Sequence, residues 1–166
     1  MLLQPSSPQL QPGDCLLYAP RGFFGWVIAT KTWHKVAHVE VYDRLGFSYA
    51  SRDGVGVGRY PVRMEDLAYV LRPQVSLNLD LGRAYAERVK GTKYGWLELA
   101  NFVGLPVRNF GIFCSQFETA FYRACGWHIF PEVEPDQVAP FEFLDLVGQG
   151  FSLVYDNVGN PHVIPQ

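Results

Sequence analysis

The chain has 166 residues, a formal net charge of −2, 48% apolar residues and only 18% charged residues. This length suits one domain with a sizeable core, and an aromatic content of 15% excludes a disordered chain. The few charges and the lack of a basic excess exclude a coiled coil and a nucleic-acid-binding module. We therefore expect a single domain over residues 1–166, with an extended arm at 1–11 and a tail at 147–166.

The N-terminal stretch has no positively charged segment followed by an apolar one, and three prolines fall within its first twelve residues. This pattern predicts no signal peptide, and no run approaches the ~18 apolar residues of a membrane span. The three cysteines form no CxxC pair and fit free thiols in a reducing compartment. We expect a cytoplasmic protein without stable membrane insertion and without a cofactor.

Short strands dominate the first half of the chain. Five are expected, at residues 15–18, 37–43, 47–52, 55–61 and 68–72. Residues 37–43 alternate with period two, and the turn at 44–46 joins them to the next strand as a hairpin. Between the strands we expect a helix at 23–35 and a helical turn at 64–67.

Helical spacing replaces the period of two in the second half. The pattern predicts helices at 79–90, 96–103 and 114–125, a capped short turn or helix at 134–137, and an edge strand at 151–155. On the third helix an apolar stripe is expected to pack against the sheet: Phe113, Phe117, Ala120, Phe121 and Ala124. The fold class is α+β, a small antiparallel sheet packed by helices.

Cys114 is the candidate nucleophile, because it opens the predicted helix at 114–125. Unpaired N–H groups and the positive end of the helix dipole stabilise a thiolate there, and the same N–H groups can hold an oxyanion. A buried cysteine at a helix start can equally serve only in packing.

His38 is the candidate base, and Glu40 shares its strand face at a spacing of ~6.6–6.8 Å. A carboxylate in that position could orient the imidazole as the third member of a triad. The alternative places both side chains on the solvent face of an edge strand. His34 and His38 have HxxxH spacing, but a helix-to-strand boundary falls between them, so we expect no metal site.

The order of these pieces resembles the permuted branch of the NlpC-type, papain-like cysteine peptidases, the YaeF/YiiX type of amidase, over roughly residues 12–146. The matching pieces are residues 13–17 (GDCLL), 37–42 (AHVEVY), 53–55 (DGV), 114–117 (CSQF) and 135–136 (PD). The resemblance implies a circularly permuted papain-like domain in which His38 precedes Cys114. It also implies that Cys114 is the nucleophile and His38 the base.

The sequence departs from this family at the third polar residue, which usually lies on the strand after the histidine. That strand reads SYASR at 48–52 and offers no Glu, His or Gln. Two residues after the histidine, where relatives commonly have a small residue, this chain has Glu40. We expect Glu40 to take the orienting role, with Ser51 as the alternative third member.

These residues predict a cysteine hydrolase acting on an amide, ester or thioester of a peptide or lipid-like substrate. The resemblance suggests cell-wall peptides as substrates. An enzyme that is not exported would reach the cell wall only after lysis of the cell, as a phage-encoded enzyme does. The layout also resembles the lecithin–retinol acyltransferase family, in which case Tyr18, Trp26 and Trp33 could line an apolar substrate groove. The third alternative is a binding module with a dead site. A Cys114 sulfur within ~4 Å of a His38 ring nitrogen would favour an enzyme.

Overall fold

The computed structural model describes residues 8–20, 36–95 and 112–158, and all structural statements concern these residues. The helices expected at 23–35 and 96–103 lie outside the described residues. Trp26 and Trp33, the rings assigned to a substrate groove, lie outside them as well.

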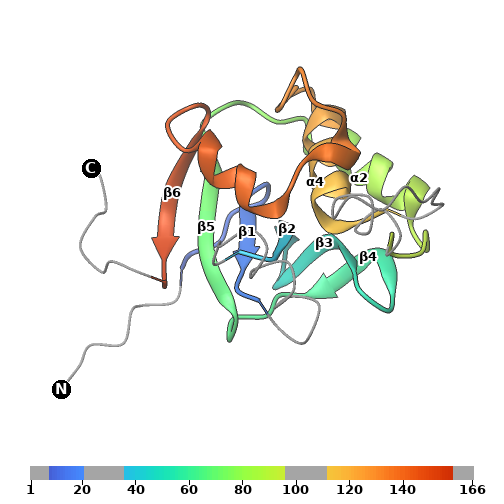
Figure 1. Ribbon diagram of the computed structural model, residues 1–166, viewed down its shortest axis with the longest axis horizontal. Coiled ribbons are helices and arrows are strands. Elements are labelled where there is room, and N and C mark those ends of the chain that lie inside the picture. Colours follow the sequence, from blue (N-terminus) through green and yellow to red (C-terminus); the bar gives the residue numbers. More distant parts are fainter. Residues whose placement is uncertain (1–7, 21–35, 96–111, 159–166) are drawn as a thin grey trace.

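The described residues form one antiparallel sheet with the strand order β4-β3-β2-β1-β5-β6 (Figure 1). Its strands are β1 (Cys15–Tyr18), β2 (His38–Arg44), β3 (Phe47–Arg52), β4 (Gly56–Pro61), β5 (Leu67–Pro73) and β6 (Phe151–Asp156). The helical elements are α2 (Leu79–Val89), α4 (Cys114–Ala124) and the short 3₁₀ helices η1 (Pro135–Gln137) and η2 (Pro140–Leu146). The expected α+β class with an antiparallel sheet is confirmed, as are the hairpin of β2 and β3 and the edge strand β6.

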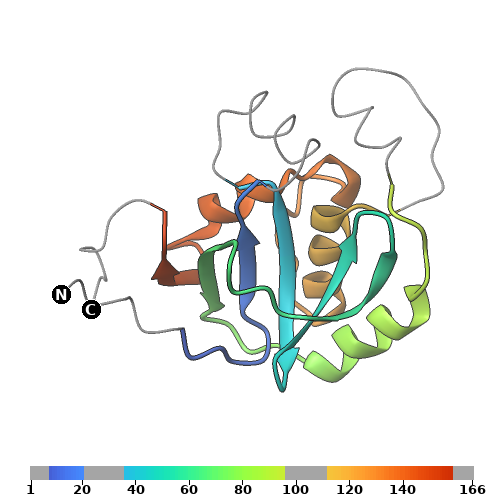
Figure 2. The same ribbon diagram turned by 90° about the horizontal axis from the view of Figure 1, so that it is seen from below.

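In place of the helical turn expected at 64–67 the structure has a single turn at residues 65–66, and Leu67 already begins β5. The Asp66 carbonyl accepts a hydrogen bond from the Ala19 N–H at 2.9 Å, so the end of this turn pairs with the chain that follows β1. The stretch between β4 and β5 crosses one face of the sheet (Figure 2). At the end of β4, where this stretch begins, Arg52 Nη2 donates to the Pro61 carbonyl at 2.8 Å.

The two faces of the sheet carry different side chains, as the period of two in β2 predicts. Val39 and Val41 are fully buried in the main core, on the face that α4 covers (Figures 1 and 2). Leu16 and Tyr18 belong to a second buried cluster, with Val62 of the crossing stretch packed against it. Glu40 is the partner of Leu16 in the β1–β2 register, so its carboxylate lies on this second face.

The buried stripe of α4 is rotated from the expected one. Phe117 and Phe121 are buried as expected, but Glu118 and Tyr122 are buried too, whereas Ala120 and Ala124 are only partly buried. The helix is buried on more than the sheet side, because α2 also packs closely against it at Gly82. A Cβ atom at Gly82 would lie 2.7 Å from the Phe121 ring, so only glycine permits this approach.

Candidate active site

Cys114 is the first residue of α4, as the sequence predicts. The Phe113 N–H donates to the Gln116 side chain at 3.3 Å, which caps the helix start. Ser51 of β3 donates to the Ile112 carbonyl at 2.5 Å, and Ser115 donates to the Val138 carbonyl at 2.5 Å. The chain on both sides of the cysteine is therefore tied to neighbouring elements, which holds the sulfur in place.

His38 begins β2, so its ring lies at the end of the sheet, where it reaches both Cys114 and the second face. Its Nε2 lies 3.0 Å from Glu40 Oε1. Cys114 lies close enough to His38 for the two groups to shift each other's pKa. The structure thus brings together the three residues proposed for the site, in the order Cys114, His38, Glu40.

Glu40 is completely buried on an interior strand, so its placement on the solvent face of an edge strand is wrong. Arg52 holds it with two hydrogen bonds, from Nε to Oε1 at 2.7 Å and from Nη2 to Oε2 at 2.9 Å. Ser48 also donates to Oε2, and the Tyr18 hydroxyl lies 3.5 Å from the same oxygen. Burial alone would raise the pKa of Glu40, but the hydrogen bonds and charges of His38 and Arg52 lower it to about 2.

The pKa values of Cys114 and His38 are shifted in opposite directions. Burial raises the pKa of Cys114, but the charge and hydrogen bond of His38 outweigh it and lower that pKa below the ordinary thiol value. Burial likewise lowers the pKa of His38, but its interactions with Cys114 and Glu40 raise it to about 9. Burial raises the pKa of Cys15 well above its usual value and that of Cys125 to about 11. Cys114 is therefore the one cysteine with thiolate character.

Tyr94 is a site residue that sequence reasoning missed. Burial, followed by the interaction with Cys114, raises its pKa well above the usual phenol value, which places the phenol close to that sulfur. The phenol thus stays protonated and can donate. The neighbouring Lys93 carbonyl accepts from the Ile112 N–H at 3.0 Å, so a pairing distant in sequence brings Tyr94 to Cys114, and no local pattern reveals it.

Arg52 is a second site residue that the sequence did not lead us to name, although its position on the predicted strand indicated which face it occupies. Ser48 and Arg52 lie four positions apart on β3, so they share the face on which Glu40 lies. Ser51 lies on the opposite face of β3 and donates to the Ile112 carbonyl. It therefore helps to fix the backbone just before Cys114 and does not contact His38 as a third member. Tyr18 is fully buried, with its ring 5.8 Å from that of His38, so it packs behind the histidine.

Glu118 lies one helical turn after Cys114 and is fully buried, and neither carboxyl oxygen has a hydrogen-bond partner. Burial raises its pKa well above the usual carboxyl value. The unfolded chain then releases this proton at lower pH than the folded chain, so Glu118 costs stability increasingly as pH rises above the ordinary glutamate range.

Replacing Glu118 by methionine is expected to raise the free energy of unfolding at neutral pH by about 1–3 kcal/mol, because an unpartnered buried polar group is removed. Urea denaturation at neutral and acidic pH measures this gain, which should be smaller in acid. Glu87→Met on the exposed side of α2 is the matched control and should change stability by less than about 0.5 kcal/mol. Equal effects of the two substitutions would contradict the argument.

Among the described residues, no group of three or more His, Cys, Asp or Glu side chains is arranged to hold a metal ion. Within the same stretches, no helix is long and apolar enough to cross a membrane. No protein-family model matches the sequence, and no curated protein is similar enough to count as a match. The interpretation of the site therefore depends on its own geometry.

Proposed function

We propose that the chain is a cysteine hydrolase of the amidase or peptidase kind, with Cys114 as nucleophile, His38 as acid and base, and Glu40 as the residue that orients His38. The observation that carries the proposal is the series Cys114–His38–Glu40, in which His38 contacts Glu40 at 3.0 Å, the pKa of the thiol is lowered and that of the imidazole is raised. Opposite shifts of this kind favour a thiolate–imidazolium pair, the reactive form of such a site.

The proposed reaction begins when the Cys114 thiolate attacks the substrate carbonyl carbon and forms a C–S bond. The Cys114 backbone N–H at the start of α4 and the Tyr94 hydroxyl are the donors for the oxyanion. His38 then gives its proton to the leaving nitrogen or oxygen as that bond breaks. In the second half, His38 takes a proton from water, and the hydroxide attack breaks the C–S bond to release the acid.

The order of the site residues along the chain, with His38 on β2 and Cys114 on α4, fits a circularly permuted papain-like domain, and we include that fold in the proposal. The substrate is an amide, ester or thioester of a peptide or lipid-like molecule. The alternative of a binding module is favoured by one observation, the 2% exposure of Cys114. The reactivity of the Cys114 sulfur distinguishes the hydrolase from the binding module.

The deciding experiment is alkylation by iodoacetamide at about pH 6, where an ordinary thiol with a pKa of about 8.5 reacts slowly. We expect rapid modification at Cys114, located by peptide mass measurement, and its loss in Cys114→Ser. Cys125→Ser is the control and should keep the wild-type rate, because burial raises the pKa of that thiol to about 11. Equal labelling of Cys114→Ser, or no labelling of the wild type, would refute the hydrolase proposal.

The pH dependence of turnover follows from His38. Interactions with Cys114 and Glu40 raise its pKa to about 9, so the imidazolium that protonates the leaving group is lost as pH rises through that value. Turnover is expected to fall above about pH 9, whereas alkylation of the thiolate continues. Measuring both rates on the same protein checks this, and a parallel fall of the two would contradict it.

A further inference from the structure

Two carboxylates interact with His38, and only Glu40 has a role in the proposed reaction. Glu40 is fully buried and is bound by Arg52. Asp53 is the first residue of the turn between β3 and β4, it is exposed, and its charge interacts with that of His38. The side chain of His38 is itself 16% exposed. Glu40 therefore contacts the imidazole from the interior, whereas Asp53 lies near it on the side of the solvent.

The backbone places the turn of Asp53 beside the segment that carries the nucleophile. Two residues earlier, Ser51 donates to the Ile112 carbonyl at 2.5 Å. Figure 2 shows this turn at the same end of the sheet as the first residues of β2 and α4. The charge of Asp53 also acts on Tyr94, which interacts in turn with Cys114. Asp53 therefore lies on the rim of the candidate site.

Asp53 forms no ion pair with a Lys or Arg of the described residues, and His38 is the one cation among them whose charge acts on it. The neighbouring Arg52 uses two of its donors on Glu40. Lys93 is exposed near the site but is not ion-paired with Asp53. Partial loss of hydration raises the pKa of Asp53, and the charge of His38 offsets this only in part. A carboxylate in this condition is suited to bind a cation supplied by a ligand.

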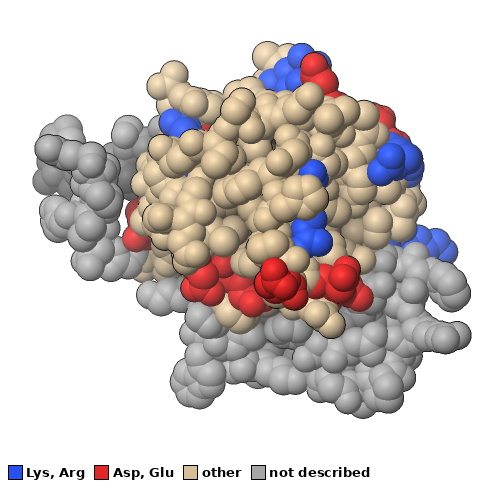
Figure 3. Space-filling view, turned by 90° about the horizontal axis from the view of Figure 1, so that it is seen from above, with Lys and Arg blue, Asp and Glu red and all other residues tan. Residues whose placement is uncertain are grey.

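The other flank of the site carries further negative charge. Ser115 donates to the Val138 carbonyl at 2.5 Å, which holds the segment between η1 and η2 against the first turn of α4. Residues 134–146 of this region include four acidic residues and no Lys or Arg. Figure 3 shows acidic side chains gathered along one margin of the molecule. The field of these carboxylates attracts a cationic substrate and repels an anionic one.

We propose that Asp53 recognises a cationic group of the substrate, a primary ammonium that lies within a few bonds of the scissile carbonyl. This inference rests on the hydrolase proposal, because it takes the Cys114 sulfur as the reacting atom. An ammonium donates charge-assisted hydrogen bonds to a carboxylate, and an amino terminus or a side-chain amine of the substrate supplies it. Asp53 then determines specificity through binding and takes no part in the proton transfers of His38.

The test uses thiol reagents of nearly equal size that differ in one charge, 2-ammonioethyl and 2-hydroxyethyl methanethiosulfonate. In each case the Cys114 sulfur forms a disulfide bond with the thioalkyl group, and methanesulfinate leaves. Each rate is followed by peptide mass measurement and divided by the rate of the same reagent with 2-mercaptoethanol. The ratio of the cationic to the neutral rate does not depend on the thiolate fraction of Cys114. A 5-ammoniopentyl reagent, which carries its amine farther from the reacting sulfur, distinguishes a side-chain amine from an amino terminus.

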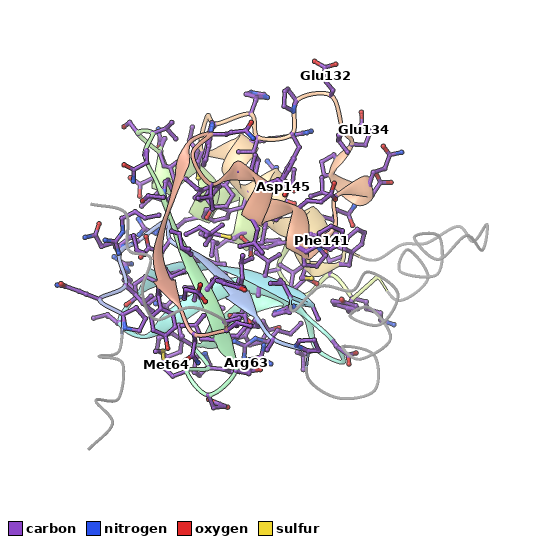
Figure 4. The ribbon with its side chains drawn as sticks, turned by 60° about the vertical axis from the view of Figure 1, so that its left-hand side comes forward. Arg63, Met64, Glu132, Glu134, Phe141 and Asp145 are labelled. Carbon is purple, nitrogen blue, oxygen red and sulfur yellow. The ribbon has the colours of Figure 1, made fainter. Side chains whose placement is uncertain are left out.

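The wild type is expected to prefer the ammonium reagent, and Asp53→Asn should lower the ratio by about three- to tenfold, the effect of one nearby carboxylate in an exposed setting. The preference should decline at high salt, and Asp53→Glu should keep most of it. Glu132→Gln is the control and should keep the wild-type ratio. Figure 4 shows Glu132 pointing outward, and Arg123 holds its segment at the last turn of α4, remote from Cys114, by donating to the Val133 carbonyl at 2.6 Å.

The proposal is overturned if Asp53→Asn keeps the wild-type ratio or if the ratio does not respond to salt. It is also overturned if Asp53→Asn shifts the pH dependence of Cys114 alkylation as strongly as Glu40→Gln does, because Asp53 would then be a second orienting carboxylate of His38. Failure of the hydrolase proposal has a different signature. Cys114 then reacts with none of the reagents in any variant, which removes the reacting atom on which the inference depends.

Discussion

Glu40→Gln is expected to lower turnover by about 10⁴-fold, the size of loss seen when the orienting carboxylate of a Ser–His site is removed. Glutamine keeps the size of the side chain but removes the charge that helps to raise the pKa of His38. The alkaline fall in turnover should therefore move below pH 9, and the pKa of Cys114 should rise. Steady-state kinetics and the pH dependence of alkylation measure these shifts.

Asp43→Asn provides the control on the same strand. Asp43 is 4% exposed and is held by Arg59 at 2.9 Å and Arg83 at 2.8 Å, so it is a buried, arginine-bound carboxylate like Glu40. No interaction links it to His38, and its substitution should reduce stability without changing the pH profile. An unchanged turnover in Glu40→Gln would remove Glu40 from the site and leave a Cys–His dyad.

Much of the fold could be predicted because its signals are local. The alternation in β2 predicts which face each side chain occupies, and the turn at Leu45 and Gly46, both with positive φ, closes the predicted hairpin. The helix α4 that begins at Cys114 follows from the helical spacing of the apolar residues between 113 and 124. These features depend on residues near one another in the chain, so a single sequence contains them.

The remainder of the site depends on pairings between distant segments. Tyr94 reaches Cys114 because Lys93 pairs with Ile112, and the burial of Glu118 follows from how α2 and the sheet enclose α4. Periodicity describes one element at a time and gives no information about such contacts. Arg52 is an intermediate case, since its face could be predicted but its partner required the register between β2 and β3.

Arg52→Met is expected to lower the free energy of unfolding by about 3–5 kcal/mol, because it leaves the buried Glu40 carboxylate without its main cation. The pKa of Glu40 lies at about 2, below its ordinary value of 4.5, so the stability it contributes is present above pH 4.5 and is lost as pH falls toward 2. Without Arg52 the pKa of Glu40 rises, and acid unfolding should begin at a higher pH. Urea denaturation across this range measures both effects.

The double variant Glu40→Gln with Arg52→Met separates charge from packing. If the loss comes from the stranded carboxylate, Arg52→Met should cost much less in the Glu40→Gln background, with an interaction free energy of about 2–3 kcal/mol. Arg52 also stacks over the Tyr60 ring at 4.7 Å, and that contact is lost in both backgrounds. An equal cost in the two backgrounds would therefore assign Arg52 to packing, and the low pKa of Glu40 would then have to come from His38.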